Sequence, residues 1–105
     1  MLTAVKIKKI KSISISYRKG FLSGRPSDGM CWALSTALQG FLSFSGYATD
    51  LIEGKVIGMD YENHFWLEYS GVIIDPTADQ CGMKDKVYIG KLPDNYIVLM
   101  KYKGI

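Results

Sequence analysis

The chain has 105 residues, of which 48% are hydrophobic and 22% charged, and its formal net charge is +3. This length accommodates one hydrophobic core and this composition excludes a disordered chain, so residues 1–105 are expected to form a single domain. The longest apolar runs have five residues, far short of the roughly 20 that a bilayer requires. Lysines also interrupt the segment where a secretory signal would need an uncharged stretch, so the prediction is a cytoplasmic protein with no membrane partner.

The N-terminal quarter is strongly basic. Residues 1–27 carry seven Lys or Arg and no acidic side chain, whereas residues 28–105 carry six basic and ten acidic ones. Apolar residues alternate with polar ones over 2–17, which predicts a strand. Lysines would protect such a strand at a sheet edge. Alternatively, the basic strip attracts an acidic partner or a nucleic acid. No nucleic-acid motif accompanies the charge, so the edge-strand interpretation is preferred.

A loop and then a helix follow. Residues 18–29 are rich in glycine, serine and proline, which predicts a loop. The next segment has apolar residues at helical spacing, with Ser27 or Asp28 placed to cap its start and Gly46 placed to end it. Gly40 inside this helix costs about 1 kcal/mol relative to alanine, which suggests close packing against another element.

The remainder of the chain has strand patterns. The expected strands are 47–58, 63–70, 72–78, 86–90 and 96–103, and Ser70-Gly71 is a plausible two-residue hairpin turn. One helix followed by several antiparallel strands predicts an α+β domain in which one central helix packs on an antiparallel sheet.

The only histidine, His64, lies in one of these strands. Counting back from a turn at Ser70-Gly71 places Asp75 on the same face as His64 and diagonal to it, within reach of the ring. A carboxylate there can accept a hydrogen bond from one ring nitrogen and leave the other nitrogen free to act as a base.

Cys31 falls in the first turn of the expected helix. Unpaired N–H groups and the helix dipole favour an anion there, so they would stabilise a thiolate and the oxyanion formed when it attacks a carbonyl. Cys31 and Cys81 are expected to be free thiols, with Cys81 inert. A small buried cysteine without chemistry is the alternative for Cys31. The cysteine and histidine spacing matches no zinc pattern, so neither a metal nor another cofactor is expected.

Three motifs resemble those of transglutaminases and related papain-like cysteine enzymes. Gly29-Met30-Cys31-Trp32 is similar to the sequence around their nucleophile. The segments from His64 to Glu68 and from Ile73 to Thr77 resemble their histidine and aspartate strands, in the same order. The resemblance covers about half the chain. It implies a papain/transglutaminase-like core with Cys31, His64 and Asp75 as a catalytic triad.

This resemblance implies a cysteine-dependent acyl-transfer enzyme that acts on amide bonds of a protein or peptide. It would be a peptidase, a deamidase or a transglutaminase, and a partner protein could complete its site. Papain-type enzymes place a glutamine shortly before the cysteine to bind the oxyanion, and residues 20–30 contain none. Tyr17, Asn63 and Trp66 are the alternative donors. A catalytically inactive interaction module on the same fold, binding an acidic partner through the basic N-terminal strip, is the competing hypothesis.

Overall fold

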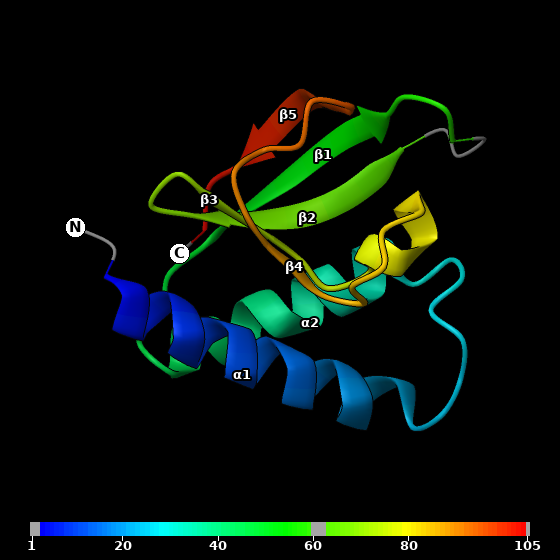
Figure 1. Ribbon diagram of the computed structural model, residues 1–105. Helices are drawn as coiled ribbons and strands as arrows, with labels where there is room; N and C mark the ends of the chain where they lie inside the picture. Colours follow the sequence, from blue (N-terminus) through cyan, green and yellow to red (C-terminus); the bar gives the residue numbers. More distant parts are fainter. Residues whose placement is uncertain (1–2, 60–62, 105) are drawn as a thin grey trace.

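The computed structural model describes residues 3–59 and 63–104 and has two helices and a five-stranded sheet. The elements are α1 (Ala4–Leu22), α2 (Cys31–Phe44), β1 (Asp50–Val56), β2 (His64–Tyr69), β3 (Val72–Asp75), a 3-10 turn η1 (Ala78–Cys81), β4 (Tyr88–Gly90) and β5 (Tyr96–Tyr102). The sheet is antiparallel, in the order β4-β3-β2-β1-β5. Both helices lie on the same side of it (Figure 1), and α2 packs on β2 and β1. The predicted α+β class is therefore confirmed.

The predicted N-terminal strand is wrong, because residues 4–22 form helix α1. Its buried residues recur every four positions, at Ile10, Ser14, Arg18 and Leu22, which is helical spacing. Thr3 caps the helix by accepting a hydrogen bond from the backbone N–H of Lys6 at 3.1 Å. The helix also takes up the first part of the predicted loop. The sheet is thus covered by two helices instead of one, and the N-terminal lysines belong to a helix instead of an edge strand.

Helix α2 begins and ends close to where the sequence predicts. Neither Ser27 nor Asp28 caps it, since the N-cap residue is Met30 and no side chain bonds there. Its end does depend on Gly46, whose φ of 94° suits glycine. The N–H of Gly46 donates to Ser43 O and that of Tyr47 donates to Leu42 O, which together form a Schellman motif.

Apolar side chains fill both faces of the sheet. On the helix side, Leu51, Leu67 and Ile74 pack with residues of α1 and α2. Their chain neighbours Ile52, Trp66 and Ile73 point to the opposite face, where they pack with residues of η1 and β5. No helix among the described residues combines the length and apolar character of a membrane-spanning segment.

Two glycines give a matched test of this packing. A Cβ at Gly40 would meet no atom within 4 Å, so the predicted close packing at this position is wrong. A Cβ at Gly54 would overlap the Trp66 ring and the Ile97 carbonyl oxygen. We expect Gly40→Ala to stabilise the protein by about 0.5–1 kcal/mol and Gly54→Ala to destabilise it by about 1–3 kcal/mol. Urea unfolding measures both, and destabilisation by Gly40→Ala would contradict the packing described for α2.

Candidate functional site

The β2–β3 hairpin brings His64 and Asp75 together. Ser70 and Gly71 have φ values of 49° and 81°, and a type I′ turn requires positive φ at both positions. Tyr69 then pairs with Val72 and Leu67 with Ile74, as expected. In the resulting contact, His64 Nε2 lies 2.7 Å from Asp75 Oδ2. The sequence-based prediction of this contact is confirmed.

Asp75 is fully buried, and hydrogen-bond donors surround its carboxyl group. Besides His64, the Tyr96 hydroxyl donates to Oδ2 at 2.6 Å. The backbone N–H of Thr77 donates to Oδ1 at 3.0 Å, and the Thr77 hydroxyl lies 3.4 Å from the same oxygen. Burial, together with the charge of Asp75, raises the pKa of Tyr96 above its usual range, so this hydroxyl keeps its proton. A carboxylate that accepts several hydrogen bonds is the acceptor that Nε2–H needs.

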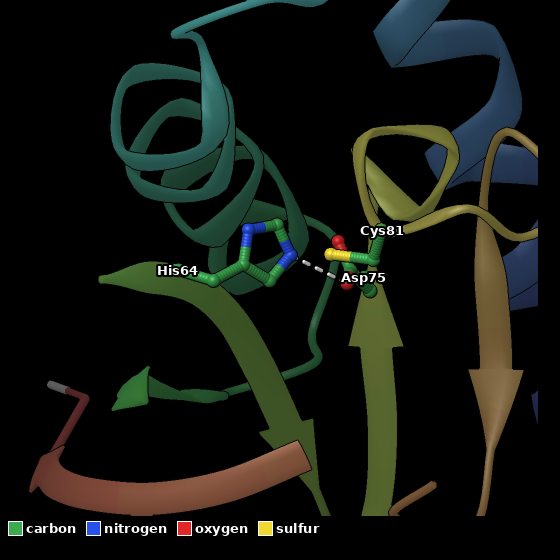
Figure 2. Close-up of side chains that lie close together, drawn as sticks. All are labelled: His64, Asp75 and Cys81. Atoms are coloured by element: carbon green, nitrogen blue, oxygen red, sulfur yellow. Dashed lines mark hydrogen bonds and ion pairs between the residues drawn. The ribbon is translucent and has the colours of Figure 1, made fainter. Parts of the chain in front are cut away.

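The His64 ring is 1% exposed, and its two nitrogens lie in different environments. Burial lowers its pKa, but the hydrogen bond and charge of Asp75 outweigh burial and, with Cys31 and Cys81 close by, raise the pKa to about 12. These interactions with Asp75 favour the protonated form of the ring. Its other nitrogen, Nδ1, is buried and has no hydrogen-bond partner of good geometry among the described residues. Figure 2 shows the ring between helix α2 and the end of β3.

Cys31 is the first residue of α2 and is partly buried. Burial raises the pKa of its thiol, but His64 and the backbone N–H groups of Phe65 and Trp32 outweigh burial, so the pKa lies below the usual 9.0. The thiol and the ring are thus close enough to shift each other's pKa, although Nδ1 is not aligned for a hydrogen bond. The structure brings all three predicted site residues together. Contacts of this kind often align only when substrate binds.

A network of polar side chains holds the segment before Cys31 against η1. The Arg18 guanidinium donates to both oxygens of Asp79, at 2.8 and 3.0 Å. Burial raises the pKa of Asp79, but Arg18 outweighs burial and the pKa is lowered. The Ser27 hydroxyl also donates to Asp79 at 3.1–3.2 Å, and the Gln80 amide donates to the Ser27 carbonyl oxygen. Ser27 therefore anchors the loop that leads into α2, instead of capping the helix.

Cys81, expected from the sequence to be inert, lies closer to the His64–Asp75 pair than the sequence indicated. The thiol lies beside Asp75 (Figure 2), and the nearest ligand atoms of His64, Asp75 and Cys81 lie within 4.8 Å of one another. Nitrogen, oxygen and sulfur ligands of this kind suit zinc, but structural zinc sites use four ligands. Both oxygens of Asp75 are already engaged by hydrogen bonds. The grouping is a hydrogen-bonded histidine–aspartate pair with a neighbouring thiol. The only sequence signal was the short spacing between Asp75 and Cys81.

The three predicted oxyanion donors lie in different environments. Tyr17 packs against Phe21 and Phe41 in the helical layer, and the Asn63 amide donates to Glu53. Trp66 is fully buried, with its ring centroid 5.8 Å from that of His64, and its Nε1–H has no partner among the described residues. The first N–H groups of α2 also lack partners within the helix. Trp66 Nε1–H and the first N–H groups of α2 are therefore the two remaining candidates for hydrogen-bond donors to an oxyanion.

A scan of protein-family models, a search of curated proteins and a search of solved structures found no match to this chain.

Proposed function

We propose that this protein is a cysteine-dependent acyl-transfer enzyme with a papain/transglutaminase-like core, and that Cys31, His64 and Asp75 are its catalytic residues. One observation carries the proposal. The Asp75 carboxylate holds the buried His64 ring, and the Cys31 thiol at the start of α2 is close enough to His64 for each group to shift the pKa of the other. A nucleophile, a base and a group that orients the base are the parts that nucleophilic acyl chemistry needs.

The charges of the site support a thiolate–imidazolium pair as the resting state. The pKa of Cys31 is lowered and that of His64 is raised, and both shifts favour a proton on the ring over a proton on the sulfur. The Cys31 thiolate would attack the amide carbonyl carbon, and the carbonyl oxygen would take up the negative charge. When the C–N bond breaks, the imidazolium would give its proton to the leaving amine, which leaves a thioester on Cys31. Water or a second amine would then release the acyl group.

The substrate is an amide in a protein or peptide. The indole of Trp32 is 57% exposed and directly follows the nucleophile. An exposed aromatic side chain there offers apolar contact to a polypeptide substrate. The N–H groups at the start of α2 would stabilise the oxyanion, because they point out of the helix beside the sulfur.

Reaction with 4-nitrophenyl acetate tests the proposal without knowledge of the natural substrate. The thiolate would displace 4-nitrophenolate and carry the acetyl group as a thioester. We expect mass spectrometry to find acetyl on Cys31 and not on Cys81, and Cys31→Ser to abolish the fast release of nitrophenolate. Added glycinamide that accepts the acetyl group would indicate a transferase, and release to water a hydrolase. Equal release by wild type and Cys31→Ser would favour the inactive interaction module instead.

A further inference from the structure

A second site lies outside the proposed catalytic residues. A cavity of about 630 Å³ opens between helix α1 and the segment 84–87 that precedes β4. Six positively charged side chains line it, against the single acidic side chain of Asp85. The six are Lys11, Arg18, Lys19, Arg25, Lys84 and Lys86. A cleft lined mostly by charges of one sign concentrates the electric field and attracts ligands of the opposite sign.

The two walls of this cavity are fixed to each other. Arg18 projects from α1 and donates to the Lys86 carbonyl oxygen at 3.0 Å and to the Pro76 carbonyl oxygen at 2.8 Å, besides its ion pair with Asp79. Its side chain is 9% exposed. The buried Arg18 side chain therefore fixes the two walls of the cavity relative to each other.

The four lysines of the cavity are free to bind a ligand, whereas the Arg25 guanidinium donates to the carbonyl oxygens of Leu22 and Phe21. Asp79 neutralises Arg18, but no ion pair within the described part of the chain uses the lysines of the cavity. Lys11 and Lys19 approach from α1, and Lys84 and Lys86 from the opposite wall. Four unpaired ammonium groups facing one space repel each other, and an anionic ligand would relieve that repulsion.

The shape and the apolar lining indicate what kind of anion fits. Ile15, Leu22 and Val87 also line the cavity, so a ligand with apolar side chains among its charges would be accommodated. The volume matches that of pockets for small ligands, roughly 300–1,000 Å³. Within residues 3–59 and 63–104, no aromatic side chain lines the cavity, whereas single-stranded nucleic acids are held largely by stacking of bases on aromatic rings.

We propose that this cavity binds an acidic peptide segment, in which carboxylates contact the lysines of both walls and an intervening apolar side chain contacts Leu22 and Val87. The proposal is independent of acyl transfer, because it rests on the cavity alone. The proposal also changes where the acidic partner expected from the basic N-terminal strip would bind, from the strip itself to this cavity. Lys11 and Lys19 take part, whereas Lys8 and Lys9 do not line the cavity.

Fluorescence anisotropy with a fluorescein-labelled peptide of alternating glutamate and leucine tests this site in the full chain. The Lys11→Gln/Lys84→Gln variant should bind the peptide about tenfold more weakly than wild type, since it removes one charge from each wall. The control, Lys8→Gln/Lys9→Gln, removes the same total charge from α1 outside the cavity and should change the affinity by less than about twofold at physiological salt. A peptide with glutamine in place of glutamate should bind at least about tenfold more weakly than the acidic one.

Three results would overturn the proposal. One is the absence of measurable binding of the acidic peptide by wild type. Another is an equal loss of affinity in both double variants, which would indicate a diffuse charge effect. The third is equal or tighter binding of a labelled oligodeoxythymidylate at the same cavity, which would assign it to nucleic acid. The four lysines replaced in the two double variants are all exposed, so circular dichroism should show unchanged folding in each variant.

Discussion

Replacing His64 with glutamine should lower the rate of Cys31 acetylation by about 10²–10⁴-fold, the usual contribution of a positioned acid–base group. The glutamine amide can still donate a hydrogen bond to the buried Asp75, but it cannot carry the positive charge that lowers the pKa of the Cys31 thiol. The variant therefore removes the cation that pairs with the Cys31 thiolate without leaving the carboxylate unpaired. Stopped-flow release of 4-nitrophenolate measures the effect.

A charge change elsewhere on the sheet provides the control for His64→Gln. Lys55 is exposed on β1, and Lys55→Gln should leave the acetylation rate within about twofold of wild type, because exposed charges at a distance are screened. The thermal unfolding midpoint of both variants reports whether the fold is intact. A folded His64→Gln protein that is acetylated at the wild-type rate would remove His64 from the mechanism.

Asp75→Ala should cause the largest loss of stability, about 3–5 kcal/mol, as expected when one partner of a buried ion pair is removed. The change leaves the His64 imidazolium, the Tyr96 hydroxyl and the Thr77 N–H without their acceptor in a fully buried position. Desolvated donors without partners are among the most costly defects of a protein interior. Equilibrium unfolding in urea measures the change in the free energy of unfolding.

Asp28→Ala is the matched control for Asp75→Ala. Asp28 is exposed and no side chain caps α2, so its loss should cost less than about 1 kcal/mol. If Asp75→Ala were as mild as Asp28→Ala, the buried carboxylate would not be holding the ring and the hydroxyl as described. The acetylation rate of Asp75→Ala should be measured at a urea concentration below its unfolding transition. A loss of rate under those conditions reports a catalytic effect, because the variant is still folded.

The β2–β3 hairpin could be predicted from the sequence because a two-residue turn fixes the register of every pair that follows it. Once Ser70 and Gly71 form the turn, strand alternation alone places Asp75 beside His64. The position of Cys31 at the start of a helix was predictable for a similar local reason, since the apolar spacing and Gly46 define the helix.

Helix α1 was not predictable in the same way, because Val5, Ile7, Ile13 and Ile15 alternate like a strand while Ile10 and Leu22 fit a helix. Tertiary packing decided between the two periods, since burial of Ile10, Ser14, Arg18 and Leu22 against α2 and the loops requires the helix. Val5 and Ile15, which supported the strand prediction, are exposed on the surface of helix α1.

The position of Cys81 and the basic cavity depend on long-range contacts. Arg18 and Lys86 meet across 68 residues of chain, and no local pattern encodes that contact. The η1 turn, which places Cys81 beside Asp75, is likewise anchored from distant parts of the chain, because Asp79 bonds Arg18 and Ser27. Sequence reasoning therefore found the residues whose geometry is set by one turn or one helix start, and missed those that the tertiary network positions.

The pH dependence of Cys31 alkylation tests the central claim most directly. The thiolate is the reactive form, and a pKa below 9.0 means that it persists at lower pH than an ordinary thiolate does. With iodoacetamide and site-resolved mass spectrometry, we expect Cys31 to react at pH 6 at least about tenfold faster than Cys81, even after allowance for the lower nucleophilicity of a low-pKa thiolate. A Cys31 rate that rises only near pH 9, or equal slow labelling of both cysteines, would contradict the thiolate–imidazolium pair and the enzymatic function built on it.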